Sequence, residues 1–305
     1  MFKNKLIHKK NILISGLHSV GKSLLLDLIH SMDKTETVNK DPILTLIASL
    51  SYVKKISYEA ASYLIRSIIN NIIYSNGLGR KINLRLYDET SILKSSNPEI
   101  YFDRMMSKKK TTIEKNNYNI FDVHNVLIQY RLWENSVPNF KLIHLERHPV
   151  DVVESVFRRK KFVYDEKKYF QILTFKENKK IVPFYLLKKK LNNYSLIDLT
   201  IEVMSNLYLQ DLKAYKKLSS KEKKNIIIVK YENLKINPKL SLNNIKKFLG
   251  LKFNKSLKSR LDKEQNTQSF IDIKREKNLK MISKIASKKQ IIKLYKISKM
   301  YEKNL

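Results

Sequence analysis

A short apolar run followed at once by a phosphate-loop pattern constrains the fold more than any other feature of the chain. Residues 11–15 (NILIS) predict a buried strand, and residues 16–23 (GLHSVGKS) have the spacing of a Walker loop. From Lys22 to Met32, apolar residues recur at helical spacing. The amides of such a loop and the positive end of the following helix form a ready anion site. We therefore expect residues 16–23 to bind a phosphate or sulfate group.

Further strands and helices alternate along the chain. Short apolar or alternating segments predict four more strands, at residues 81–89, 118–123, 140–146 and 225–230. Helical patterns cover residues 41–74, 150–159, 196–218, 240–250 and 289–302. This alternation predicts an α/β protein with a three-layer, P-loop-like fold, in which helices cover both faces of a central, mostly parallel sheet. Ligands then bind at the carboxyl ends of the strands.

Composition narrows the class of protein. The 305 residues include only 5 Gly and 6 Pro, so no linker is visible and we expect one domain over residues 1–305, with a basic helical tail at 255–305. The absence of cysteine excludes disulfides and thiolate nucleophiles, and no histidine pair has a metal-ligand spacing, so no metal is expected. With no signal-peptide pattern, and with its longest apolar stretch too short to span a bilayer, we expect a cytoplasmic protein without a transmembrane segment.

The formal net charge is +33. The lysines are spread along the chain rather than gathered in one arm, which is typical of compositional bias and does not indicate a specific nucleic-acid partner. A uniformly positive protein still attracts polyanionic substrates and phosphorylated donors. A basic nucleic-acid-binding protein remains an alternative.

Two more strand ends carry chemistry. Arg147 follows strand 140–146, and its planar fork suits a phosphate, with the hydroxyl of Ser155 two helical turns further on. His124 follows strand 118–123, which we expect to neighbour the other two strands and to place this imidazole at the mouth of the crevice. There it could accept the proton of a substrate hydroxyl.

Three blocks of the sequence resemble the sulfotransferases that use 3′-phosphoadenosine 5′-phosphosulfate (PAPS). Residues 140–162 resemble the family's 3′-phosphate segment, in which Arg147, Asp151 and Ser155 match the spacing. Residues 226–251 resemble its strand, Tyr-Glu-Asn-Leu turn and helix ending in Phe-Leu-Gly-Leu, and residues 16–23 are similar to its 5′-phosphosulfate loop. The blocks come in the family's order and span most of the chain.

The resemblance implies PAPS as donor, no metal requirement, His124 as catalytic base and transfer to a hydroxyl or amine. The implied donor-binding residues are Gly16, His18, Ser19, Val20, Gly21, Lys22, Ser23, Arg147 and Ser155. His18 and Ser19 stand where the family usually has Pro and a basic residue, and we expect Lys22 to replace that base and to act in catalysis. Other family branches use a carboxylate base, which leaves three further candidates: Asp88, Glu89 and Asp122.

The resemblance leaves other points open. The family's basic C-terminal segment has no clear match, although residues 272–280 supply Lys274 and Arg275. The acceptor would contact mainly residues 41–115 and the basic stretch 157–170, which favours an anionic glycan, a lipid-linked sugar or a small molecule. The oligomeric state stays open.

Two further functions compete with this interpretation. A P-loop kinase or NTPase would use Lys22 and Ser23 with Asp122 holding Mg²⁺ beside ATP or GTP. A catalytically inactive binding protein on the same fold is the other, because the first loop departs from the family pattern.

Overall fold

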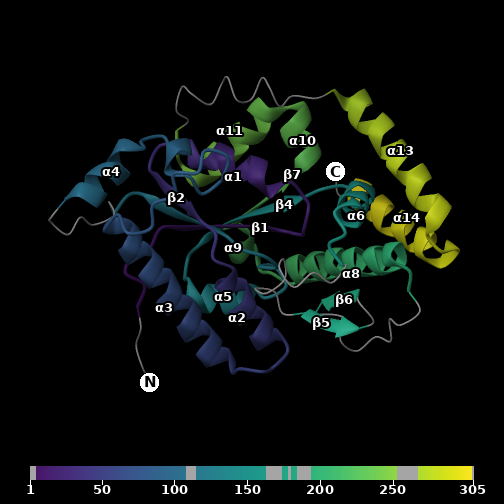
Figure 1. The fold of residues 1–305 in the computed structure, drawn as a ribbon, viewed down its shortest axis with the longest axis horizontal. Helices are drawn as coiled ribbons and strands as arrows, with labels where there is room; N and C mark the ends of the chain where they lie inside the picture. Colours follow the sequence, from purple (N-terminus) through teal and green to yellow (C-terminus); the bar gives the residue numbers. More distant parts are fainter. Residues whose placement is uncertain are drawn as a thin grey trace.

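A computed structural model describes residues 5–107, 115–162, 174–177, 180–183, 194–252 and 267–303. Its main sheet has five parallel strands in the order β2-β3-β1-β4-β7 (Figure 1). Their bounds are β1 Asn11–Gly16, β2 Thr35–Asn39, β3 Tyr118–Asp122, β4 Lys141–Glu146 and β7 Ile226–Lys230. An antiparallel pair, β5 Thr174–Glu177 and β6 Lys180–Pro183, forms a second sheet.

Helices connect the strands. Those of the first half are α1 Lys22–His30, α2 Pro42–Tyr52, α3 Tyr58–Gly77, the 3₁₀ helix η1 Ile92–Lys94, α4 Glu99–Met106 and α5 Tyr130–Ser136. Those of the second half are α6 Pro149–Arg158, α8 Leu196–Lys216, α9 Ser220–Lys223, α10 Tyr231–Ile236, α11 Pro238–Leu249, α13 Gln268–Ile285 and α14 Lys288–Lys303. Among the described residues, no helix is both long and apolar enough to cross a membrane.

Both faces of the parallel sheet are buried. Along β1, Ile12 and Ile14 belong to one apolar core and Leu13 to the other, because successive side chains of a strand point to opposite faces. Residues of α1, α6, α8, α11 and α14 build the first core, and residues of α2, α3 and α5 build the second. Figure 1 shows α1 and α11 on one side of the sheet and α2 and α3 on the other. The expected three-layer α/β architecture is confirmed.

Most of the predicted strands are present, but the strand predicted at residues 81–89 is wrong. The strands expected at 11–15, 118–123, 140–146 and 225–230 are β1, β3, β4 and β7. Residues 81–89 form no strand, and Tyr87 within them is 97% exposed. Beside β3, the sheet edge is instead occupied by β2, which the sequence analysis did not predict.

Burial of polar side chains explains why β2 was missed. All five of its residues (TETVN) are buried, although only one is aliphatic. Arg104 of α4 pairs with both oxygens of Glu36, at 2.6 and 3.0 Å, and Asn117 donates to the same carboxylate at 2.9 Å. Burial alone would raise the pKa of Glu36, but the hydrogen bonds from Arg104 lower it. The Glu36 carboxylate is therefore charged, and it depends on α4 for its partner.

We expect Arg104→Met to lower the free energy of unfolding by about 3–5 kcal/mol, because it leaves the Glu36 charge buried without its partner. The double variant Glu36→Leu/Arg104→Met should lose much less, since it buries no charge. Urea unfolding of both variants measures the difference. A double variant as unstable as the single one would contradict this account of β2.

Candidate active site

The phosphate-loop residues join β1 to α1 with a backbone that requires glycine. Gly21 caps α1 with φ 97°, a conformation that L side chains rarely adopt. A Cβ at this position would lie 2.4 Å from Cε2 of Tyr231, so the phosphate loop and the first residue of α10 meet with no space for a side chain. The first amides of α1 consequently face the crevice with the positive end of the helix dipole behind them.

Arg147 lies against this loop. It follows β4, which pairs directly with β1, and its Nη1 donates to the Ser19 carbonyl oxygen at 3.1 Å. Its guanidinium stacks on the Tyr231 ring, 4.7 Å from the centroid. Within the described part of the chain, Arg147 Nε and Ser19 Oγ are buried polar atoms without hydrogen-bond partners. Because such atoms are costly unless a partner satisfies them, the pair fits a bound phosphate.

Ser155, the second expected 3′-phosphate ligand, lies two turns into α6 and is 3% exposed. Asp151 of the same helix accepts from Asn278 Nδ2 at 2.9 Å and pairs with Arg275 Nε at 3.3 Å. Arg275 therefore joins α13 to α6, and it lies within 3.5 Å of Glu232 as well. Arg275, one of the C-terminal bases without a role in the sequence analysis, thus connects helix α13 to the segment 147–155.

Lys22 is the centre of a partly buried polar cluster. Its Nζ lies 2.5 Å from Asp122 Oδ1 and 3.2 Å from the Val123 carbonyl oxygen. The two ring nitrogens of His124 lie 3.1 and 3.4 Å from the same ammonium. Burial lowers the pKa of Lys22, and the neighbouring Asp122 carboxylate opposes that shift. The structure therefore brings Lys22, His124 and Asp122, three expected site residues, into direct contact.

Two imidazoles stack at this cluster. The rings of His18 and His124 have centroids 4.6 Å apart. Burial, followed by the nearby Lys22 charge, lowers the pKa of His18 to about 4 and the pKa of His124 well below its ordinary value. Both rings are neutral at neutral pH, so each retains a nitrogen lone pair that can accept a proton. We expected the strands before His124 and Arg147 to be neighbours. They are not, because β1 lies between β3 and β4. His124 and Arg147 therefore lie on either side of the phosphate loop that follows β1.

The carboxylates considered as bases have different surroundings. Asp88 accepts from the backbone and the hydroxyl of Thr90 at 2.9 and 2.8 Å, so it shapes its own turn. Glu89 accepts from Ser23 Oγ at 3.3 Å and from Lys40 Nζ at 2.7 Å. Asp122 is engaged by Lys22. Of the three, Asp122 and Glu89 contact the phosphate loop, through Lys22 and Ser23 respectively.

Lys40 is a site residue that the sequence analysis missed. Its Nζ lies 3.8 Å from Asp122 Oδ2 in addition to its contact with Glu89, which links it to the Lys22 cluster. Burial lowers the pKa of Lys40, but the hydrogen bond with Glu89 and the charges of the nearby carboxylates together outweigh burial, so the net shift of this pKa is upward. The signal that could have found Lys40 is its place at the carboxyl end of β2, a strand that the sequence pattern did not reveal. The basic stretch expected to contact the acceptor lies outside the described residues beyond Phe162.

The neutral histidines predict acid sensitivity. As the pH falls below about 6.5, an unfolded imidazole takes up a proton, whereas folded His18 stays neutral to about pH 4. Stability from this residue is thus present above pH 6.5 and is lost towards pH 4. We expect His18→Gln to lose less stability than the parent between pH 7.5 and 5, by on the order of 1–2 kcal/mol, in urea unfolding. If the parent and His18→Gln lost equal stability between pH 7.5 and 5, the pKa of folded His18 would not be lowered.

The chain was then compared with known proteins. No curated protein matches the sequence. Among solved structures, the sulfotransferase domain from the curacin biosynthetic pathway is 14% identical, with 83% of this chain and 77% of that chain covered and a TM-score of 0.45. Sulfotransferase STF1 from Mycobacterium tuberculosis H37Rv is 10% identical, with coverages of 92% and 78% and a TM-score of 0.45. Mouse sulfotransferase SULT7A1, complexed with PAP, is 12% identical, with coverages of 84% and 64% and a TM-score of 0.40.

A family model gives the assignment. The model described as the sulfotransferase domain matches residues 10–301, which include the phosphate loop, both histidines of the cluster, Arg147 and the helical tail. Because the matched region takes in nearly the whole sequence, the chain belongs to the sulfotransferase domain family.

Proposed function

We propose that this sulfotransferase transfers a sulfuryl group from PAPS to a hydroxyl of its acceptor. The observation that carries the proposal is the meeting of the phosphate loop with Arg147, where Arg147 Nε and Ser19 Oγ are buried without partners. A donor with phosphates at both its 5′ and 3′ positions needs two anion sites. The loop supplies one, and Arg147 lies at its edge to supply the other.

The donor's 5′-phosphosulfate lies against the loop amides, with the Ser23 hydroxyl and the Lys22 ammonium beside it. Arg147 and the Ser155 hydroxyl bind the 3′-phosphate, which ATP and GTP lack. Tyr231 stabilises this arrangement, because its ring supports the guanidinium of Arg147 and at the same time packs against Gly21.

The reaction is an in-line displacement at sulfur. A bond forms between the acceptor oxygen and sulfur, the bond between sulfur and the bridging phosphate oxygen breaks, and 3′-phosphoadenosine 5′-phosphate (PAP) leaves. Neutral His124 takes the acceptor proton, and Lys22 stabilises negative charge on the departing oxygen. His124 and Lys22 are within hydrogen-bond distance of each other, so one cluster serves both ends of the displacement.

The kinase alternative assigns Asp122 to Mg²⁺. In the structure the Asp122 carboxylate is bonded to the Lys22 ammonium, and the family assignment accounts for the Arg147 and Tyr231 segments that a kinase leaves unexplained. We therefore favour the sulfuryl donor.

Donor binding is tested with PAP and no added metal. A ligand that binds only the native state raises the melting temperature, so we expect PAP to stabilise the protein, with the shift lost in Arg147→Ala. Arg131→Ala is the matched control, because this arginine is exposed and its ion pairs, with Glu134 and Glu222, involve no residue assigned to the donor site. Each variant is compared with its own ligand-free melting curve. Stabilisation by Mg-ATP or Mg-GTP alone, indifferent to Arg147→Ala, would contradict the proposal.

The catalytic assignments make a separate prediction. We expect His124→Ala to lower transfer by about 10²–10⁴-fold and Lys22→Met by about 10²–10³-fold, while His124→Ala keeps its PAP-induced melting shift. Release of PAP from PAPS in a mixed pool of sugars, sugar phosphates and phenols measures transfer. The exposed Lys55 provides the control Lys55→Met. A parent protein that binds PAP but transfers nothing would instead support the inactive binding protein.

A further inference from the structure

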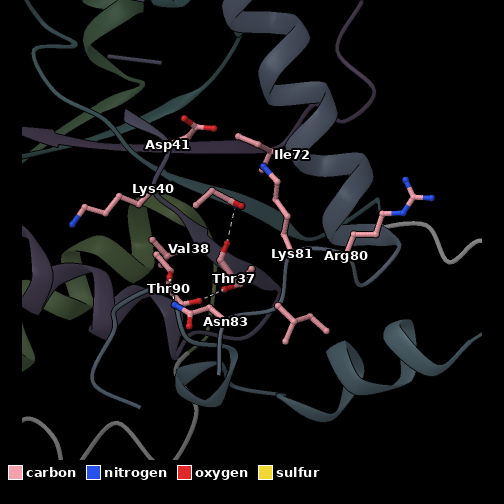
Figure 2. Close-up of a pocket in the computed structure, with 11 residues that line it drawn as sticks. Thr37, Val38, Lys40, Asp41, Ile72, Arg80, Lys81, Asn83 and Thr90 are labelled. Carbon is pink, nitrogen blue, oxygen red and sulfur yellow. Dashed lines mark hydrogen bonds between the residues drawn. The ribbon is translucent and has the colours of Figure 1, made fainter. Parts of the chain in front are cut away.

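A pocket of about 320 Å³ lies beside the Lys22 cluster (Figure 2). It is bounded by the carboxyl end of β2, by Ile72 of α3 and by the segment 80–90 that follows α3. Its volume falls at the small end of the range for small-molecule sites. The mechanism described above uses none of this space.

The lining of the pocket is polar and positively charged. Three of its residues, Lys40, Arg80 and Lys81, carry positive charge, and Asp41 is the one carboxylate. Hydroxyl and amide groups come from Thr37, Asn39, Asn83 and Thr90, and the aliphatic side chains are Val38, Ile72 and Ile82. Such a lining favours a hydroxylated, anionic molecule over a phenol or a steroid, which would need an apolar wall.

The polar wall is fixed by its own hydrogen bonds. Asn39 donates to the carbonyl oxygens of Thr37 and Ile120, at 3.0 and 3.1 Å, and accepts from Asn76 at 2.9 Å. Asn83 donates to the Thr90 hydroxyl at 2.7 Å. Figure 2 shows this Asn83–Thr90 contact at one side of the pocket. Because these groups already hold one another, the pocket needs little rearrangement to receive a ligand.

Lys81 is the cation best placed to meet that ligand. In Figure 2 its side chain runs along one side of the pocket towards Ile72, whereas Arg80 turns away and lies 6.0 Å from the Tyr74 ring centroid. Asp41 accepts from the Ile43 amide at 3.0 Å and so caps α2. In the part of the chain that the structure describes, no ion pair involves the Lys81 ammonium.

The end of β2 and the segment 80–90, which line the pocket, also contact the phosphate-loop residues and Asp122. Lys40, directly after the pocket residue Asn39, lies 2.7 Å from Glu89, and Glu89 accepts from Ser23 of the phosphate loop. Lys40 also approaches Asp122, the partner of Lys22. A molecule anchored at Lys81 can therefore extend along the end of β2 towards the sulfuryl group.

We propose that this pocket is the acceptor subsite and that it takes a small polyol carrying an anionic group, such as a sugar phosphate. Lys81 binds the anion, the Thr37 and Thr90 side of the pocket contacts hydroxyls, and the hydroxyl nearest Lys40 is the one that is sulfated. This inference rests on the proposed function, because it names the substrate class of the same site.

Matched acceptor pairs test the inference on the protein with PAPS. The pairs are glucose 6-phosphate with methyl glucoside and glycerol 3-phosphate with glycerol, and 4-nitrophenol is the apolar comparison. We expect the phosphorylated member to be sulfated at least 10-fold better in kcat/KM. Lys81→Glu should raise its KM at least 10-fold with little change in kcat. Lys55→Glu, the same charge change at an exposed site away from the pocket, should behave as the parent protein.

Binding to the PAP-loaded protein gives a readout that needs no turnover. Glucose 6-phosphate should raise the melting temperature beyond the effect of equal inorganic phosphate, and Lys81→Glu should abolish that difference. Three results would overturn the inference. The neutral sugar, glycerol or 4-nitrophenol could react as well as the phosphorylated acceptors, or the preference for phosphorylated acceptors could persist in Lys81→Glu. The third is that neither glucose 6-phosphate nor glycerol 3-phosphate binds. The PAP-induced shift separates this failure from failure of the proposed function, since Lys81→Glu must leave that shift intact.

Discussion

One buried carboxylate, that of Glu232, joins the loop after β4 to the two C-terminal helices. It accepts from the His148 amide at 2.9 Å and from the Tyr301 hydroxyl at 2.7 Å, with Arg275 Nη2 at 3.5 Å. These three partners come from the loop after β4, from α14 and from α13. A charge buried to this degree is stable only when its partners are in place, so the first turn of α10 fixes the loop that presents Arg147 and anchors both C-terminal helices.

The residue before Glu232 extends this constraint to the phosphate loop. Tyr231 packs against Gly21 so closely that no Cβ fits, and its other neighbour is the Arg147 guanidinium. Two consecutive residues thus position both anion-binding parts of the site, one through a carboxylate and one through a ring. The resemblance of residues 226–251 to the family therefore reflects a structural requirement, because Tyr231 and Glu232 position the phosphate loop and Arg147 without needing to react.

The sequence predicted the strands whose burial follows from their own residues. β1, β4 and β7 each contain at least three aliphatic residues, and β3 contains the apolar pair Ile120 and Phe121. These strands lie in a sheet covered on both faces, so their apolar residues are visible in the sequence without a partner. β2 could not be recognised in this way, because Glu36 and Asn39 become buried only through Arg104 and Asn76, distant in the chain. Residues 81–89 show the converse error, since their alternation has no neighbouring strand to pair with.

The same limit applies to the candidate site: residues in local patterns could be predicted, and residues that depend on distant partners could not. The phosphate loop is a local backbone pattern and was evident, whereas Lys40 was missed because it follows β2. Glu89 was named as a candidate base, but its contacts with Lys40 and Ser23 could not be predicted from the sequence. The charged pairs of this site bear on how the proposed donor would bind. Lys22 and Lys40 are held by Asp122 and Glu89, and burial lowers the pKa of Lys22. Under the proposed function, a phosphosulfate beside Lys22 adds negative charge that favours the ammonium form of this lysine, so donor binding itself strengthens the cation that we assign to the leaving phosphate.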